Sequence, residues 1–352
     1  MSSQPIGETP GFLYDRALAE QAAGRFHEAV QLLWQASQQG DVPSMSLLGA
    51  QLMSGRGAPP DPPAGARLIF EAAERGGAYA CALASSIAAS TFAGPPEWER
   101  ALDYLERSAE LGHAPAQAQL KLLARFKGEV RPRPSAWSRL RRRVDLGAWR
   151  AAPAARTLLA DPAMAVVERF ASADVCDWII ERARERLAPA MVYDTGAFRP
   201  VQKQGRTNSV AGFDLVYLDL VVLLIRERLA QVCGRPVAAM EAPQVFHYAV
   251  GQSFAHHFDF LDAAAPGHAA DLARKGQRAQ TLLIYLNDGF EGGETDFPVL
   301  GLTFKGRKGD ALTFTNVQAD GSPERRMYHA GLSPTAGEKW LFSQWVRDRA
   351  QG

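Results

Sequence analysis

Three side chains in the second half of the chain have the types and the spacing of metal ligands. His257 and Asp259 are separated by a single residue, Phe258, and alternate residues of a β-strand project to the same side. An imidazole and a carboxylate placed in this way supply two of the three ligands of a facial triad, which binds Fe(II) and leaves three positions open. The third ligand would be His329, the only histidine C-terminal to His268.

The other histidines of this half are expected to have structural or surface roles. His256 is expected on the outer face of the same strand, and His247 lies next to the start of another strand. His268 lies in residues 261–278, a long segment rich in Ala, Gly and charged residues. A segment of this length between strands is typical of a lid. A lid histidine could reach a substrate, but we expect that His268 does not.

Short strands separated by turns are predicted around these residues, and this pattern indicates a sandwich or a closed barrel. The predicted strands cover residues 163–170, 244–250, 280–286, 311–315 and 339–346. Two helices are also predicted, one that starts after the N-cap Ser172 and one over residues 214–233. Helices followed by strands predict an α+β arrangement rather than a doubly wound sheet.

The first half of the chain repeats one helical phrase at intervals of about 36 residues. The copies end at Gly40, Gly76 and Gly112, and a weaker copy ends at Gly147. Glycine suits the end of a helix because it adopts the left-handed conformation at little cost. Ala-rich second helices are predicted over residues 44–52, 78–89 and 114–124. Paired helices at this period predict an α-solenoid of helical hairpins.

The composition is that of an ordinary globular protein. The 39 Lys and Arg residues nearly balance the 38 Asp and Glu residues, which gives no support for binding to nucleic acid or to a membrane surface. A basic cluster, Arg139 and Arg141 to Arg143, has the spacing of a solvated helix face. The three cysteines form no CxxC pair, which argues against a disulfide framework and a zinc cluster. The chain shows no signal peptide and no long apolar stretch, so we expect a cytoplasmic protein.

Several phrases in the second half, taken together, resemble the catalytic domain of the prolyl 4-hydroxylases. They lie at residues 170–176, 206–208, 248–259, 281–287, 292–298, 305–314, 329–331 and 337–340, and at Trp345. The resemblance implies a dioxygenase that depends on Fe(II), 2-oxoglutarate and O₂, with ascorbate as a candidate further cofactor. It also implies a double-stranded β-helix, or jelly roll, with flanking helices.

The same resemblance implies roles for individual residues. His257, Asp259 and His329 would be the iron ligands and the catalytic centre. Lys339 would pair with the 5-carboxylate of 2-oxoglutarate, because a buried carboxylate without a partner is costly. Tyr285 and Tyr248 match phenols near this co-substrate, and Tyr285 is the stronger candidate for a hydrogen bond to its carboxylate.

Residues of the predicted substrate region are less well defined. Arg206 matches an arginine that could contact the substrate. Asn208 stands where the family has Ser, and Gln344 stands where many relatives have Lys. Both positions are expected near bound substrate, so they bear on the identity of the substrate rather than on the iron chemistry.

The repeats resemble the Sel-type relatives of tetratricopeptide repeats, on the pattern of Gly55, Gly57, Asp61 and Ala64. We therefore expect an α+β chain of two domains. Residues 1–155 would form an α-helical solenoid of Sel/tetratricopeptide-like repeats, and residues 156–352 a prolyl 4-hydroxylase-like dioxygenase domain.

Three functions are compatible with this sequence. The first is hydroxylation of peptidyl proline in a protein substrate, giving succinate and CO₂, with the helical repeats helping to recruit that protein or peptide. The second is hydroxylation of a free amino acid or a small metabolite. The third is a repeat-based scaffold without catalytic activity, which the intact ligand set argues against. No nucleic-acid or membrane partner is expected.

Overall fold

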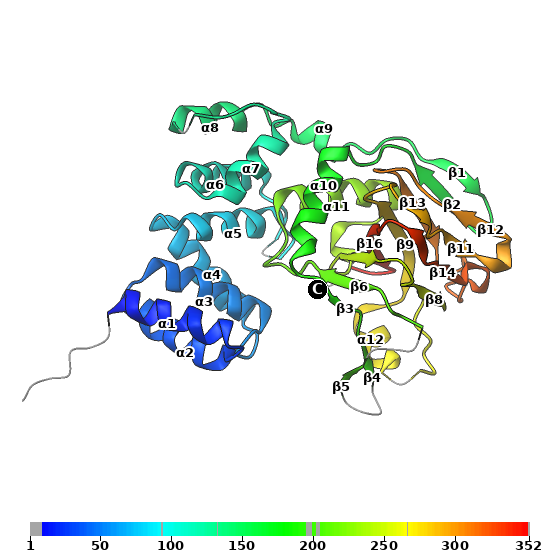
Figure 1. The fold of residues 1–352 in the computed structure, drawn as a ribbon, viewed down its shortest axis with the longest axis horizontal. Coiled ribbons are helices and arrows are strands. Elements are labelled where there is room, and N and C mark those ends of the chain that lie inside the picture. Colours follow the sequence, from blue (N-terminus) through cyan, green and yellow to red (C-terminus); the bar gives the residue numbers. More distant parts are fainter. Residues whose placement is uncertain are drawn as a thin grey trace, which may run out of the picture. The chain divides into compact units, whose positions relative to one another are not determined.

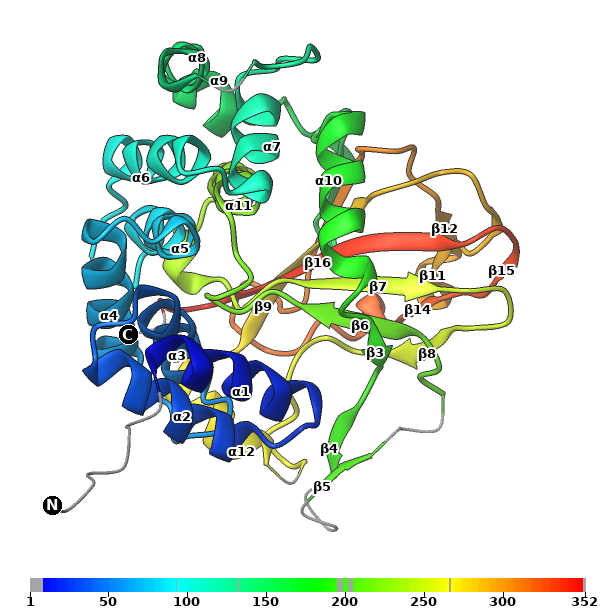
Figure 2. The ribbon, with the colours of Figure 1, turned by 60° about the vertical axis from the view of Figure 1, so that its left-hand side comes forward.

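The computed structural model describes residues 9–92, 94–131, 133–194, 199–201, 205–265 and 267–350. The chain divides into two compact units. One comprises Met1–Ala148 with Asp214–Leu223, and the other comprises Trp149–Phe213 with Leu224–Gly352. Helices form the first unit and antiparallel strands dominate the second (Figures 1 and 2), which confirms the predicted α+β class. The first unit ends at Ala148 rather than at residue 155, and it also includes the short later segment 214–223.

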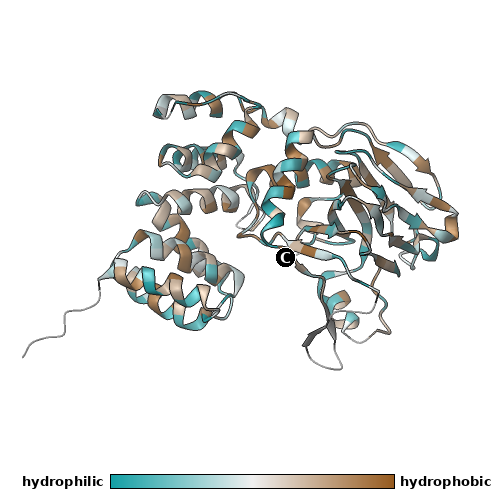
Figure 3. Cartoon of the chain, in the orientation of Figure 1, coloured by the Kyte–Doolittle hydropathy of each residue, from teal (hydrophilic) through white to brown (hydrophobic). Residues whose placement is uncertain are grey.

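The first unit is an array of helical hairpins. Its helices are α1 (Pro10–Ala22), α2 (Phe26–Gln38), α3 (Val42–Ser54), α4 (Pro62–Glu74), α5 (Ala78–Ala89), α6 (Trp98–Glu110), α7 (Ala114–Leu123) and α8 (Pro134–Arg141), and α9 (Leu146–Arg150) follows. Apolar faces of neighbouring helices meet in two clusters, one around Leu33 and Leu48 and one around Ile69 and Ile87. Figure 3 shows hydrophobic and hydrophilic residues on the same helices, as amphipathic packing requires.

Glycines follow the helices of the array as predicted. Gly40, Gly76 and Gly112 have φ of 83°, 86° and 88°, in the left-handed region that favours glycine. The prediction for Gly147 is wrong, because this residue lies inside α9 instead of ending a helix. The Asp145 carboxylate accepts a hydrogen bond from the Ala148 N–H at 2.9 Å, so a new helix begins at this point.

The turn between α3 and α4 depends on the residues that carry the repeat resemblance. Gly55 ends α3 with φ of 70°, and Gly57 has φ of 85°. Asp61 then caps α4, since its carboxylate accepts a hydrogen bond from the Ala64 N–H at 3.0 Å. The sequence therefore specifies both the end of one helix and the start of the next.

The basic cluster is exposed at Arg139, Arg142 and Arg143, as its spacing predicts, and Arg141 is the exception. The side chain of Arg141 is 22% exposed and forms ion pairs with Glu99 and Asp103 of α6. The Arg143 guanidinium lies 5.6 Å from the centroid of the Phe126 ring. The ion pairs of Arg141 fix α8 against α6, so this residue of the cluster has a structural role.

The segment Asp214–Leu223 packs within the first unit. Ser86 Oγ donates to the Leu218 carbonyl at 2.8 Å, and the Leu220 N–H donates to Gln119 Oε1 at 3.2 Å. The helix predicted from residue 214 begins later, as α11 (Leu220–Cys233). The Asp219 carboxylate caps this helix by accepting from the Val222 N–H at 2.9 Å.

Two antiparallel sheets form most of the second unit. The larger sheet has the order β1-β2-β13-β9-β16-β7-β6-β3, and the smaller sheet has the order β12-β11-β14-β8. The larger sheet contains β1 (Arg156–Leu159), β2 (Met164–Val167), β3 (Ala188–Pro189), β6 (Ser209–Gly212), β7 (Gln244–Tyr248), β9 (Arg278–Tyr285), β13 (Ala311–Thr315) and β16 (Lys339–Arg347). The smaller sheet contains β8 (Phe254–His257), β11 (Thr295–Phe297), β12 (Leu302–Phe304) and β14 (His329–Gly331). Two short pairs complete the unit, β4 (Val192–Asp194) with β5 (Arg199–Val201) and β10 (Glu291–Gly292) with β15 (Pro334–Ala336).

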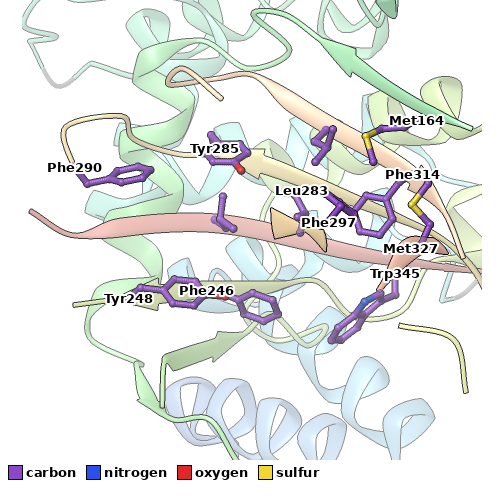
Figure 4. Close-up of a cluster of buried hydrophobic side chains, with 12 residues drawn as sticks. Met164, Phe246, Tyr248, Leu283, Tyr285, Phe290, Phe297, Phe314, Met327 and Trp345 are labelled. Atoms are coloured by element: carbon purple, nitrogen blue, oxygen red, sulfur yellow. The ribbon is translucent and has the colours of Figure 1, made fainter. Parts of the chain in front are cut away.

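Side chains of both sheets share one hydrophobic core. Tyr248, Tyr285 and Phe314 come from the larger sheet and Phe297 comes from the smaller one (Figure 4). Two antiparallel sheets packed through such a core form the double-stranded β-helix that the sequence predicts. The predicted strands appear as β2, β7, β9, β13 and β16, which place the same residues at the core.

One further helix of the second unit was predicted, and another forms within the segment predicted as a lid. Ser172 caps α10 (Ala173–Arg184), because its hydroxyl accepts from the Val175 N–H at 3.4 Å. The predicted lid contains α12 (His268–Lys275), which buries none of its residues. Arg347 holds this helix by donating to the Asp271 carboxylate at 2.7 Å and to the Gly276 carbonyl at 2.6 Å.

Among the described residues, every helix falls short of the length and apolar character that crossing a membrane requires.

The close approach of α3 and α4 yields a stability prediction. A Cβ atom on Gly49 would lie 2.8 Å from the Gly65 carbonyl oxygen and 2.7 Å from Cγ1 of Ile69. Gly49→Ala should therefore lower the free energy of unfolding by about 1–3 kcal/mol, because the helices must separate to admit the methyl group. Gly11→Ala in α1 is the control, since a Cβ there meets nothing within 4 Å. Equal stability of both variants in urea titrations would contradict this packing.

Candidate metal centre

His257, Asp259 and His329 converge as the sequence predicts. One ligand atom from each of the three residues lies within 4.8 Å of the others, and no other such group occurs among the described residues. His257 ends β8 and His329 begins β14, and the two residues pair across these antiparallel strands. Asp259 lies just beyond β8 rather than within it, yet its carboxylate still turns toward both imidazoles, 3.5 Å from His257 Nε2 and 3.6 Å from His329 Nε2.

Both imidazoles are oriented by the same kind of hydrogen bond. His257 Nδ1 lies 2.9 Å from the Ala255 carbonyl oxygen, and His329 Nδ1 lies 2.9 Å from the Met327 carbonyl oxygen. A carbonyl oxygen can only accept, so Nδ1 carries the proton in both rings. The Nε2 lone pairs are therefore directed toward Asp259, as metal ligation requires.

Aromatic rings restrict the movement of both imidazoles. The Phe254 ring is stacked on His257, with centroids 3.7 Å apart and an angle of 12° between the planes. The Phe314 ring meets His329 edge to face at 5.0 Å, and Phe297 lies 5.5 Å away on another side. The ligands thus project from a packed core, and their rotamers are fixed by it.

The protonation states of these groups suit a divalent cation. Burial lowers the pKa of the His329 imidazole to about 4, so the ring is neutral and can donate its lone pair at neutral pH. Burial alone would raise the pKa of the Asp259 carboxyl, but His329, His257 and Thr281 outweigh this effect and lower it. Two imidazoles and one carboxylate form the donor set of non-haem Fe(II) oxygenases.

Lys339 provides a second test, of whether the site fits 2-oxoglutarate as well as a metal ion. It begins β16, it is fully buried, and its Nζ has no hydrogen-bond partner in the described part of the chain. Burial lowers the pKa of this ammonium to about 7, although Glu294 opposes the shift. Its Nζ lies 5.0 Å from the ring centroid of Tyr248, which lines the same cavity as the three ligands. An unpaired cation at this point fits the distal carboxylate of 2-oxoglutarate.

The surroundings of the two tyrosines reverse their predicted order as candidates for a hydrogen bond to the carboxylate of 2-oxoglutarate. The Tyr285 hydroxyl donates to the Phe304 carbonyl at 3.0 Å and lies 2.8 Å from Thr295 Oγ1. Its proton is therefore already used, and Tyr285 cannot also donate to a carboxylate without losing that bond. Tyr248, which the sequence ranks second, lines the cavity itself. Tyr248 is thus the better placed phenol, and Tyr285 supports the wall behind it.

Arg206 lies beside the cavity and stacks on its wall. Its guanidinium is 4.2 Å from the ring centroid of Phe254 and 5.2 Å from that of Phe246, and both rings line the cavity. Its Nε donates to Asn208 Oδ1 at 3.3 Å, so the departure from the family pattern at Asn208 orients Arg206. A substrate contact for Arg206 stays a prediction.

The remaining histidines lie outside the centre, as expected. His256 Nε2 is 2.8 Å from the Asp296 carboxylate, and His247 Nε2 is 2.9 Å from the Glu338 carboxylate. His268 Nδ1 lies 3.2 Å from the carbonyl oxygen of Asp262, within the lid segment.

The expectation that Gln344 lies near the substrate is wrong. Its side chain is fully buried and donates to the Glu241 carbonyl at 2.7 Å. The alternation of β16 instead turns Leu341, Ser343 and Trp345 toward the cavity, and all three line it. Sequence reasoning missed Ser343, although counting by twos from Lys339 would have found it.

The chain is similar to several known proteins. The model of the 2OG-Fe(II) oxygenase superfamily matches residues 243–347. Prolyl 4-hydroxylase 1 of Arabidopsis thaliana is 31% identical over 205 residues, which cover 54% of this chain and 70% of that protein. The 2OG complex of the viral collagen prolyl hydroxylase from Paramecium Bursaria Chlorella virus-1 is 26% identical over 52% of this chain and 94% of its own, with a TM-score of 0.41. A Sel1 repeat protein from Oxalobacter formigenes is 17% identical over 40% of this chain and 61% of its own, with a TM-score of 0.32.

The unpaired ammonium of Lys339 predicts a pH-dependent cost in stability. Between pH 7 and pH 10.5 the unfolded chain holds this proton and the folded chain does not, so the free energy of unfolding rises with pH in that window. Lys339→Met should therefore stabilise the metal-free protein by a few kcal/mol at pH 7 or below, and the gain should shrink toward pH 10.

Urea titrations of the metal-free protein at several pH values would measure this effect. Lys308→Met is the control, because Lys308 pairs with Asp177 near the surface and should change stability by no more than about 1 kcal/mol. A Lys339→Met protein that is less stable than wild type at every pH would contradict the unpaired state of Lys339.

Proposed function

Because this chain belongs to the 2OG-Fe(II) oxygenase superfamily, as a relative of the prolyl 4-hydroxylases, we propose that it hydroxylates a peptidyl proline of a protein substrate. It is a dioxygenase that uses Fe(II), 2-oxoglutarate and O₂. One observation carries the proposal: the three ligand residues and Lys339, a buried lysine without a hydrogen-bond partner in the described part of the chain, lie at the same cavity.

His257, Asp259 and His329 would hold Fe(II) at the cavity that all three residues line. When bound, Fe(II), 2-oxoglutarate and O₂ supply the oxidising power for hydroxylation of an unactivated C–H bond, with succinate and CO₂ as co-products. The Asp259 carboxylate offsets part of the metal charge inside a buried site. The protein contributes position and the exclusion of water.

Lys339 and Tyr248 would orient the co-substrate. A carboxylate next to Lys339 would restore the charge of that ammonium, whose pKa burial lowers to about 7. Tyr248 presents its ring to Lys339 and lines the cavity. Together they would fix the distal end of 2-oxoglutarate, so that its other end faces the three ligands.

The cavity wall favours a proline within a peptide over a free amino acid. Apart from the ligand set, the described residues that line the cavity are uncharged, and aromatic and aliphatic side chains predominate: Phe246, Phe254, Leu283, Leu341 and Trp345. A free amino acid would bring an ammonium and a carboxylate. Arg206 beside the cavity could pair with the carboxylate, but apart from the ligand set the described lining residues offer no anionic partner for the ammonium. A peptide-bound proline carries neither charge, and its ring is apolar.

We also propose that the helical array helps to recruit the protein substrate. Arrays of this kind bind peptides and proteins through extended surfaces. Trp34 on α2 supports this role, since 51% of its surface is exposed and exposed tryptophans are frequent binding hot spots.

Succinate formation from 2-oxoglutarate tests the activity directly. Protein loaded with Fe(II) under anaerobic conditions and then exposed to O₂ should form succinate faster with a proline-containing peptide than with its alanine counterpart. His257→Ala should lower this turnover on the order of 100-fold or more, because a ligand is lost. His256→Ala is the matched control and should keep most of the turnover, because its side chain pairs with Asp296 outside the centre.

Turnover that no peptide stimulates would move the proposal to a small-molecule substrate. Wild-type protein that neither binds Fe(II) nor consumes 2-oxoglutarate would overturn the enzymatic function altogether.

Recruitment by the array predicts a separate effect on affinity. Trp34→Ala should raise KM for a protein substrate roughly tenfold, the scale of a single binding hot spot. It should leave kcat, and the KM of a short proline peptide, unchanged. Steady-state kinetics with both substrates would measure this, and an equal effect on both would exclude recruitment through Trp34.

A further inference from the structure

The carboxylate of Asp259 receives a hydrogen bond from a residue that the ligand pattern does not include. Thr281 Oγ1 donates to Asp259 Oδ2 at 2.7 Å, and both side chains are buried. Thr281 lies on β9, on the face that also carries Leu283 and Tyr285 toward the core. A buried carboxylate needs such a donor, since water does not reach it.

A third residue sets the direction of this hydrogen bond. Asn316 Nδ2 lies 2.8 Å from Thr281 Oγ1, and Asn316 is 2% exposed. A carboxylate that is ionised can only accept, so the threonine hydroxyl must give its proton to Asp259. Its oxygen is then left to accept from the amide of Asn316. The chain of donors therefore runs from Asn316 through Thr281 to Asp259 in one direction.

The backbone holds this chain in place. Thr281 pairs with Phe314 across β9 and β13, and Asn316 follows immediately after β13. The Asn316 N–H donates to the Ala279 carbonyl at 2.8 Å, and its own carbonyl accepts from the Glu324 N–H at 3.0 Å. Phe314, two residues before Asn316, packs against His329. The end of β13 thus supports two of the three ligands.

We infer that Thr281 and Asn316 are positioning residues for the metal, which act through the carboxylate of Asp259. Thr281 occupies one lone-pair direction of Oδ2 and fixes the rotation of the carboxylate, which leaves the remaining directions for the cation. Asn316 fixes the orientation of the Thr281 hydroxyl. This inference rests on the proposed role of His257, Asp259 and His329 as ligands.

Metal affinity tests the inference without catalysis. Co(II) serves as the probe because it does not support the reaction with O₂ in this site. Its visible absorption reports the geometry of the ligands. Thr281→Val keeps the shape of the side chain and removes the hydroxyl. It should weaken Co(II) binding roughly 10- to 100-fold, the range for residues that orient a ligand, and should change the visible spectrum. Thr281→Ser keeps the hydroxyl and should restore most of the affinity.

Thr313→Val is the matched control. Thr313 is also a buried threonine of the larger sheet, and its hydroxyl accepts a hydrogen bond from Gln280 Nε2 at 2.8 Å. Its hydroxyl thus serves Gln280, so the variant should bind Co(II) as wild type does. Thermal unfolding of each metal-free variant separates loss of affinity from loss of the fold.

Asn316→Leu tests the second step of the chain. It should weaken Co(II) binding less than Thr281→Val, since it removes only the residue that orients the hydroxyl. The double variant should match Thr281→Val alone, because Asn316 has no path to the metal once the hydroxyl is gone.

The outcomes separate this inference from the proposed function. If Thr281→Val binds Co(II) with wild-type affinity and spectrum while Asp259→Ala does not bind it, the ligand set stands and the positioning role is overturned. If wild type and Asp259→Ala bind Co(II) equally, the ligand assignment itself fails. A lack of stimulation by peptides would alter the substrate and leave the Co(II) results as they are.

Discussion

The hydrogen bonds that run from the two ligand imidazoles to backbone carbonyls are the interactions on which this metal centre depends. Each ring donates from Nδ1 to the carbonyl two residues before it, so the strand that carries a histidine also sets its tautomer. The pairing of β8 with β14 then brings the two Nε2 atoms to one point. Because backbone groups define these directions, the geometry follows from strand register as well as from side-chain packing.

The same core contains a destabilising group, the buried side chain of Lys339. A buried ammonium without a partner lowers stability, and the structure keeps it where an anionic ligand would pair with it. In the proposed binding mode, 2-oxoglutarate would offset this loss of stability, and its affinity would depend on protonation of Lys339. Sites that carry such unpaired groups trade stability for binding.

Much of this fold follows from local sequence. Glycine spacing identified the helical hairpins, and the predicted strands include β16, which carries Lys339. The strand β14, which carries His329, was not predicted. The failures have a common cause, because they depend on partners distant in sequence. The rank of Tyr285 depends on the Phe304 carbonyl, and the position of Gln344 depends on Glu241. Thr281 and Asn316 also escaped notice, because only the register of β9 against β13 brings them to Asp259.

The segment Asp214–Leu223 makes the helical unit discontinuous in sequence. During synthesis, residues 149–213 leave the ribosome before this segment does, so the array cannot bury its last hydrogen-bond partners, Leu218 and Leu220, until more than half of the chain has been made. Domains usually complete their folding in the order of synthesis. Here the helical unit can be completed only after residues 149–213 of the other unit have been made. A gene fragment that ends before residue 214 would therefore encode the array without its final segment.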